Sequence, residues 1–188
     1  LFPWERHDYT DAYRDAWRQT SAGTEGAIAE DHEFATYAID LDGILLPDVP
    51  SSRYEADLAA ALAERDALLP FERLPGIDFE RAKAIVTGRP EMDRTRTAAW
   101  LARHGFDAPR LVMRDPSRHG DAPHQVAAHK AQAALALSCT HFVESDPVQA
   151  IHIARFAPLM RVIWWNADDG AGHLVSSHRW GVGAMAAQ

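Results

Sequence analysis

The sequence predicts an α/β fold in which a parallel sheet is covered by helices on both faces. Segments with the composition of strands alternate with segments of helical periodicity, and the connections are short and contain no internal repeat. Polar residues also stand directly after four of the predicted strands. In a parallel sheet, this is the edge at which ligand sites form. We therefore expect a three-layer domain with its site at one edge of the sheet.

The N-terminal part differs in composition from the rest of the chain. Residues 1–33 are polar, and Tyr9, Tyr13 and Trp17 recur at a spacing of four, as on one face of a helix. Glycine and serine interrupt this pattern over residues 21–26. We predict an N-terminal helical extension over 1–33, followed by the α/β domain over 34–166.

The alternation begins with an apolar, β-prone run over 34–39 that ends abruptly in a polar turn. Residues 54–69 carry spaced leucines and many alanines and end at Pro70, which predicts a helix. The next predicted strand covers 82–86. A helix is predicted over 91–104, with Met92, Thr95, Ala99 and Trp100 at helical spacing and Gly105 as its stop.

The second half repeats the pattern. Strands are predicted over 110–113, 140–143 and 160–165, and helices over 123–137 and 148–156. The last segment, 167–188, contains several glycines, and we expect it to be loosely ordered.

Composition excludes several classes of protein. The chain has 188 residues with a formal net charge of −8, which argues against a general nucleic-acid or anionic-membrane binder. A single cysteine, Cys139, excludes a disulfide framework and a cysteine-rich zinc module. No apolar run approaches the roughly 18 residues of a membrane span, and no secretory signal is visible. We expect a cytoplasmic protein; its first residue is Leu1, so a longer gene product is compatible with the sequence.

The residues after the strands are predominantly charged. They are Asp40 and Asp42 after the first strand, Thr87 after the second, Arg114 and Asp115 after the third, and Glu144 and Asp146 after the fourth. Two neighbouring carboxylates repel each other, and such pairs commonly hold a cation or divide acid and base roles. Asp-Gly is also ordinary turn chemistry, so Asp42-Gly43 alone does not decide between function and structure.

Taken together, four segments resemble the motifs of the haloacid dehalogenase (HAD) superfamily. The first motif matches residues 37–43 (YAIDLDG), the second 85–89 (IVTGR), the third Lys130, and the fourth 142–146 (FVESD). The resemblance covers roughly 34–166 with motif order and spacing preserved. It implies a Rossmann-like, HAD-like parallel sheet and a phosphatase that requires Mg²⁺.

The resemblance also implies a role for each residue. Asp40 would be the nucleophile, forming an aspartyl-phosphate, and Asp42 the general acid and base. Thr87 would bind the phosphoryl oxygens, and Lys130 would neutralise charge. Magnesium would lie on Asp40, on the Asp42 backbone carbonyl and on a fourth-motif acid.

Each role has a structural alternative. Thr87 could cap the following helix, and Lys130 could be an exposed lysine on an alanine-rich helix. Glu144 and Asp146 could cap the helix near Pro147.

The fourth motif departs from the family pattern. The family usually has paired aspartates or Gly-Asp after the strand, whereas Ser145 stands in the second position here, between Glu144 and Asp146. Serine is a weaker metal ligand than a carboxylate. We therefore predict Glu144 or Asp146 as the metal ligand.

Substrate contacts and size follow from the remaining features. We predict Gly43, Gly88, Arg89 and Arg114 as substrate-binding residues, since a guanidinium binds phosphate in a bidentate manner, although solvated surface arginines are an equal alternative. Neither insert between motifs has the length of a lid domain, so we expect no large cap. An open site suits a large phosphorylated substrate, or a partner chain or second copy that covers it.

Two narrower resemblances bear on the substrate. Residues 88–101 and 111–114 are similar to the 3′-phosphatase domain of phage polynucleotide kinase, so a nucleic-acid 3′-phosphate end stays possible although nucleic acid is otherwise disfavoured. Residues 100–105 and 142–145 resemble uncharacterised HAD-like domains found beside phosphoribosyltransferases. Two hypotheses follow: a Mg²⁺-dependent phosphatase, or a catalytically weak HAD-like module that binds a phosphorylated ligand or a partner protein.

Overall fold

A computed structural model describes residues 34–106, 110–168 and 170–175. The predicted helical extension over 1–33 lies outside the described residues. The compact unit that contains the sheet begins at Thr36.

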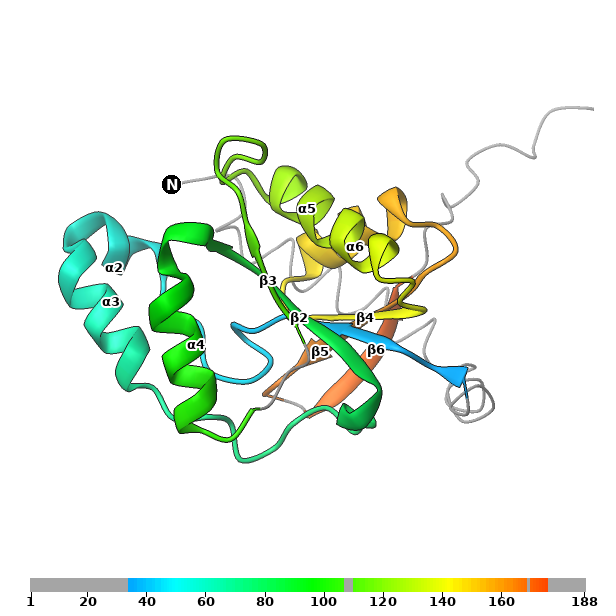
Figure 1. The fold of residues 1–188 in the computed structure, drawn as a ribbon, viewed down its shortest axis with the longest axis horizontal. Helices are drawn as coiled ribbons and strands as arrows, with labels where there is room; N and C mark the ends of the chain where they lie inside the picture. Colours follow the sequence, from blue (N-terminus) through cyan, green and yellow to red (C-terminus); the bar gives the residue numbers. More distant parts are fainter. Residues whose placement is uncertain (1–33, 107–109, 169, 176–188) are drawn as a thin grey trace, which may run out of the picture. The chain divides into compact units, whose positions relative to one another are not determined.

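The described part contains one six-stranded sheet in the order β3-β2-β1-β4-β5-β6 (Figure 1). Its strands are β1 (Tyr37–Ile39), β2 (Ala82–Pro90), β3 (Leu111–Arg114), β4 (His141–Glu144), β5 (Arg161–Asn166) and β6 (Ala171–Val175). The first five pair in parallel, and β6 pairs antiparallel with β5. The predicted α/β class with a parallel sheet is confirmed.

Two groups of helices cover the sheet (Figure 1). They are α2 (Ser51–Ala56), α3 (Leu58–Ala67) and α4 (Arg94–Arg103) on one side, and α5 (Pro123–Ala136) and α6 (Pro147–Phe156) on the other. Right-handed crossovers explain the division: the chain moves outward from β1 to β3 and then returns to the centre at β4, which reverses the face that its helices cover.

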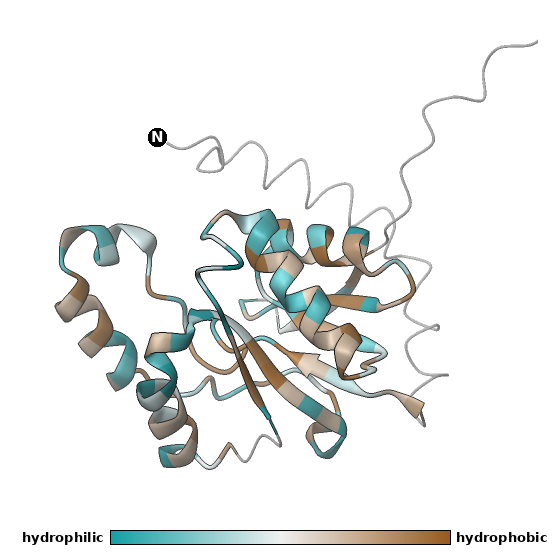
Figure 2. Cartoon of the chain, turned by 45° about the horizontal axis from the view of Figure 1, so that its top comes forward, coloured by the Kyte–Doolittle hydropathy of each residue, from teal (hydrophilic) through white to brown (hydrophobic). Residues whose placement is uncertain are grey.

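The core lies around β1, which is buried along its whole length. Tyr37, Ala38 and Ile39 are each at most 2% exposed, as expected for a central parallel strand with helices on both faces. Figure 2 shows hydrophobic colour along the strands and both colours on the helices. Such helices bury one face against the sheet and leave the other in water.

Several predicted boundaries are wrong. The helix expected over 54–69 is two helices, because Asp57 is extended (φ −156°) and accepts a hydrogen bond from the Ala60 N–H, which starts α3 anew. The strand expected over 82–86 continues to Pro90, so Thr87 lies inside β2. Met92 is 82% exposed, and the buried side of α4 is formed by Thr97, Trp100 and Leu101.

The segment expected to be loosely ordered, 167–188, contains β6. This prediction is therefore wrong for Ala171–Val175, where antiparallel pairing with β5 orders residues whose glycine-rich composition did not suggest a strand.

The connection between β1 and β2 contains α2, α3 and a turn of 3₁₀ helix (Phe79–Arg81), and no cap domain is evident in the described part of the chain. Among the described residues, no helix has the length and apolar character needed to cross a bilayer.

Candidate active site

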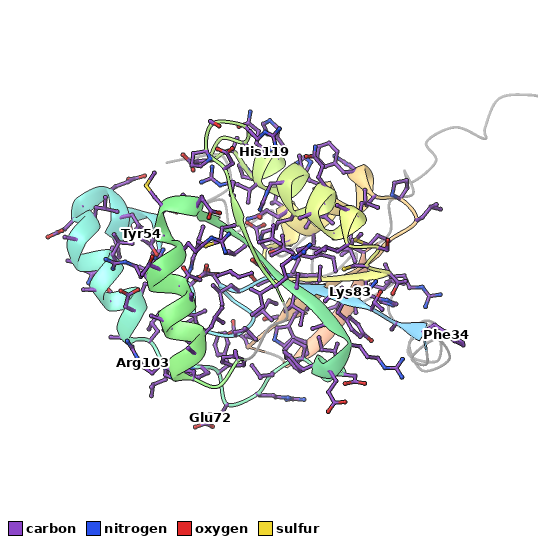
Figure 3. The ribbon with its side chains drawn as sticks, in the orientation of Figure 1. Phe34, Tyr54, Glu72, Lys83, Arg103 and His119 are labelled. Carbon is purple, nitrogen blue, oxygen red and sulfur yellow. The ribbon has the colours of Figure 1, made fainter. Side chains whose placement is uncertain are left out.

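A cleft of about 620 Å³ opens at the edge where β1, β2 and β4 end. One wall comes from the loops after these strands, and the other comes from α2 and α3, which contribute Tyr54 (labelled in Figure 3), Leu58 and Arg65. Of the predicted site residues, the cleft is lined by Asp40, Asp42, Gly88, Arg89, Arg114, Lys130, Glu144 and Asp146. The expectation that the polar strand ends gather at one edge holds for these residues.

Asp40 stands immediately after β1 at the bottom of this cleft. Its backbone N–H donates to the Val143 carbonyl at 2.9 Å, so it continues the pairing of β1 with β4. The residue is 4% exposed, and its Oδ2 accepts a hydrogen bond from Lys130 Nζ at 2.8 Å. Its other oxygen, Oδ1, is buried and has no hydrogen-bond partner among the described residues. A buried carboxylate oxygen without a partner is costly unless a ligand binds it.

Lys130 projects from α5 between two carboxylates. Its Nζ lies 2.8 Å from Asp40 Oδ2 and 2.7 Å from Glu144 Oε2. Its side chain is 2% exposed, so the alternative of a solvated surface lysine is wrong. Burial alone would lower the pKa of Lys130, but the charges of Asp40 and Glu144 overcome this and raise it. Lys130 therefore stays charged.

The two carboxylates of this triad share a single cation. Burial raises the pKa of Asp40, and the charge of Lys130 offsets only part of that increase. Burial, and then the charge of Asp40, raise the pKa of Glu144 well above its usual range. With both carboxylates ionised the triad would carry more negative than positive charge, an excess that either a proton or a further cation would relieve.

Glu144 is the last residue of β4 and is fully buried. Its Oε2 binds Lys130, and its Oε1 accepts hydrogen bonds from the backbone N–H groups of Ser145 and Asp146 at 3.0 and 3.1 Å. Both oxygens therefore have protein partners. These contacts hold Lys130 and the turn after β4 in place.

Asp146 begins α6. Its Oδ1 accepts from the Val148 and Gln149 N–H groups at 2.7 and 3.1 Å, and its Oδ2 accepts from Gln149 Nε2 at 3.1 Å. This is the helix cap that the sequence offered as the structural alternative. The metal-binding roles of Glu144 and Asp146 stay predictions, and the oxygens of both are engaged elsewhere.

Asp42 lies opposite Arg89 of β2. The guanidinium donates from Nη2 to Oδ1 at 2.5 Å and from Nε to Oδ2 at 2.8 Å, a bidentate ion pair. Arg89 also donates to Thr97 Oγ1 at 3.2 Å and is 6% exposed. The cleft thus holds Arg89 in a fixed orientation, and its guanidinium engages both carboxylate oxygens of Asp42.

Thr87 and Arg114 are buried, with partners inside the protein. Thr87 is 1% exposed, does not line the cleft, and accepts the Arg89 N–H at 3.1 Å. Arg114 donates from Nε to the Gly88 carbonyl at 2.8 Å, from Nη1 to the His119 carbonyl at 2.6 Å, and from Nη2 to Asp121. Solvation of a free surface arginine is therefore excluded for Arg114. Its contacts stabilise the loops beside the cleft.

Gly43 permits the turn after Asp42. Its φ of +73° disfavours any other residue, and its N–H donates to the Leu46 carbonyl at 2.7 Å, so the chain reverses direction. A Cβ at this position would stand 2.3 Å from Ser145 Oγ and 2.8 Å from Asp48 Oδ2. The glycine therefore lets two loops come together, a packing role that the prediction of substrate binding did not include.

Asp48 is the site residue that sequence reasoning missed. It lines the cleft beside Asp40 and Asp42. Its side chain keeps an exposed surface, but the surrounding protein removes part of its water, and this desolvation, followed by the charges of Asp42 and Asp40, raises its pKa to about 7. No motif spacing marks Asp48, because only the reversal at Gly43 brings it back to the site.

With every carboxylate ionised, the formal charge of the cleft is negative. Its described lining contains seven carboxylates (Asp40, Asp42, Asp48, Asp93, Asp121, Glu144 and Asp146) and four cations (Arg65, Arg89, Arg114 and Lys130). A phosphate dianion entering this cleft alone would meet net repulsion. A divalent cation would remove most of that excess of negative charge.

The donor atoms suit a hard cation such as Mg²⁺, because they are oxygens and include the partnerless Asp40 Oδ1. No three His, Cys, Asp or Glu side chains of the described residues converge to hold a metal by themselves. Mg²⁺ does not require such a cage, since it commonly binds through one or two carboxylates and keeps several waters. The residues present therefore fit the ion.

The chain has a distant structural similarity to a known protein. Neither a family model nor a curated protein matches the chain. One similar solved structure is that of the Pnkp1/Rnl/Hen1 RNA repair complex. Its matching chain is 18% identical with a TM-score of 0.47, and the match covers 69% of this chain and 42% of that one. The matched region is thus less than half of that protein.

Proposed function

We propose that this protein is a Mg²⁺-dependent phosphatase of the HAD type that hydrolyses phosphoric monoesters through Asp40. The observation that supports this most directly is the state of the Asp40 carboxylate. One oxygen is bound by Lys130 at 2.8 Å, and the other is buried at the cleft without a partner. A carboxylate held from one side by a cation leaves its second oxygen for attack on phosphorus.

The reaction would proceed in two displacements. Asp40 Oδ1 attacks phosphorus, the bond from phosphorus to the leaving oxygen breaks, and Asp42 gives that oxygen a proton. Water then attacks the aspartyl-phosphate, returns a proton to Asp42 and releases phosphate. The bound cation would supply charge neutralisation for the phosphoryl oxygens, and Lys130 would keep Asp40 oriented.

Arg89 would control the proton step. It holds both oxygens of Asp42 in the resting site. We expect the substrate phosphate to compete with Asp42 for the guanidinium, since phosphate accepts the same bidentate pair. Binding would thereby release Asp42 beside the leaving group, where it would take up a proton from water and then serve as the acid.

The leaving group of the substrate would contact the wall formed by α2 and α3. This wall carries Tyr54, Leu58 and Arg65. No cap domain is evident in the described part of the chain. We therefore propose that the substrate is large, or that a partner chain covers the site.

Hydrolysis of p-nitrophenyl phosphate with and without Mg²⁺ tests the proposal. We expect Mg²⁺-dependent turnover that falls at least about a thousandfold in Asp40→Asn, because the nucleophile is lost. Asp115→Asn, at an aspartate that does not line the cleft, is the matched control and should keep full activity. Equal activity of Asp40→Asn and the control would refute the nucleophile.

A second function is favoured by the Asp42–Arg89 ion pair together with Ser145. If the pair does not open, Asp42 cannot serve as acid, and the site is a weak enzyme that binds a phosphorylated ligand or partner. Beryllofluoride with Mg²⁺ mimics a phosphorylated aspartate. Tight binding that disappears in Asp40→Asn supports the phosphatase, whereas phosphate binding without turnover supports the binding module.

A further inference from the structure

The turn at Gly43 brings an acidic residue from a different loop to the position where the fourth motif lacks one. Asp48 Oδ2 and Ser145 Oγ both lie within 2.8 Å of the point at which a Cβ on Gly43 would stand. The Asp48 carboxylate and the Ser145 hydroxyl are therefore neighbours across Gly43. The serine replaces an acid of the family pattern, and a carboxylate stands beside it.

Ser145 itself is already used. Its Oγ donates to the Asp42 backbone carbonyl at 3.0 Å. This carbonyl keeps a second lone pair, because a carbonyl oxygen accepts two hydrogen bonds or ligands. The Asp42 carbonyl, Ser145 and Asp48 thus form one small group of oxygens beside Asp40.

The other acids of the fourth motif have their oxygens committed. Glu144 binds Lys130 and two backbone N–H groups, and Asp146 caps α6. By contrast, Asp40 is 4% exposed, lines the cleft, and has an oxygen without a partner among the described residues. This buried, partnerless atom indicates that the acidic group is a site for a ligand, and not solely a surface cluster.

We propose that Asp48 is the second carboxylate ligand of the Mg²⁺ site, with the Asp40 carboxylate as the first, and that it replaces the fourth-motif acid missing at Ser145. This inference is based on the proposed function. Two carboxylates, one backbone carbonyl and water complete the ligand set that Mg²⁺ prefers. Because this ligand set uses two carboxylates, it does not require a cluster of three acidic side chains, and the described residues contain no such cluster.

Metal binding to the full chain, measured without substrate, tests the proposal. Titration calorimetry with Mg²⁺, and paramagnetic resonance with Mn²⁺ as a second readout, should show at least about tenfold weaker binding to Asp48→Asn, a loss of about 1.4 kcal/mol. The side chain of Asp48 is exposed, so this variant should fold, which circular dichroism verifies.

Two further variants separate coordination from general charge. Asp121→Asn removes the same charge from a side chain that lines the same cleft and is 93% exposed, and it should bind metal within threefold of the wild type. The double variant Asp48→Asn/Ser145→Asp returns a carboxylate to the neighbouring position and should recover most of the affinity.

The outcomes are distinguishable. The role of Asp48 is overturned if Asp48→Asn binds metal as tightly as the wild type, or if Asp121→Asn loses as much metal affinity as Asp48→Asn. If the wild type still hydrolyses p-nitrophenyl phosphate with Mg²⁺, the proposed function stands without a metal-binding role for Asp48. If the wild type neither binds Mg²⁺ nor turns over substrate, both proposals fail.

Discussion

Replacing Lys130 by methionine tests the buried charge arrangement on which the site depends. Methionine has a similar length and no charge, so the change keeps much of the packing and removes the cation. Asp40 and Glu144, 6% and 0% exposed at their side chains, then face each other without it. Removing one partner from a buried ion pair costs about 3–5 kcal/mol. For a domain of this size, that loss lowers the Tm by roughly 6–20 °C.

The loss of stability should depend on pH in a definite direction. Burial already raises the pKa values of Asp40 and Glu144 above those of the unfolded chain, and loss of Lys130 raises them further. The folded variant therefore holds protons that the unfolded chain releases. Its stability is greatest below the unfolded pKa and decreases as pH rises toward the folded pKa, by about 1.4 kcal/mol per pH unit for each retained proton.

Urea unfolding at several pH values between about 5 and 8 measures both effects. The control is Lys83→Met at the chain's only other lysine (Figure 3), whose Nζ donates to the Leu137 and Ser138 carbonyls at 3.0 and 2.9 Å. We expect this control to lose at most about 1.5–3 kcal/mol, with the pH slope of the wild type. If the two variants lost the same free energy of unfolding and showed the same dependence of stability on pH, the reasoning about the triad would be refuted.

Two other substitutions test the local geometry. Gly43→Ala should cost more than about 2 kcal/mol in urea unfolding, because it combines a strained φ of +73° with a Cβ 2.3 Å from Ser145 Oγ. Gly105 has the same φ and open space around it, so Gly105→Ala should show the cost of backbone strain alone. Equal losses of unfolding free energy in the two variants would contradict the clash with Ser145. Asp146→Ala should cost about 1 kcal/mol of unfolding free energy, because the helix cap is lost, and should leave Mg²⁺ affinity within threefold of the wild type. A tenfold loss of affinity would instead support Asp146 as a metal ligand.

Much of the fold could be predicted because each element has a local pattern. The alternation of strands and helices, and the parallel sheet, follow from periodicity and connection length. Local pattern did not show that Asp57 would break a helix, because capping competes with an otherwise continuous alanine-rich run. It also did not show β6, whose order depends on the neighbouring strand β5 and not on its own residues.

The candidate site could be predicted where a residue fits a motif. Asp40 also stands at a strand end, Lys130 was found from its motif position alone, and the structure brings the two within 2.8 Å. The partner of Asp42 was not predictable, because its ion pair with Arg89 joins residues 47 positions apart. Asp48 was missed since its position depends on the turn at Gly43 and on the second loop that packs there.

The charge arrangement of the cleft connects these features. Phosphatase chemistry requires a dianion to enter a cleft in which acidic side chains outnumber basic ones by seven to four. Lys130 is already committed to Asp40 and Glu144, and Arg89 to Asp42, so neither has a free charge in the resting site. In the proposed mechanism, a divalent ion held by Asp40 and Asp48 would supply positive charge to the cleft, and the incoming phosphate would compete with Asp42 for Arg89. Metal binding would thus help to attract the substrate, and substrate binding would free Asp42 for the proton transfer that hydrolysis requires.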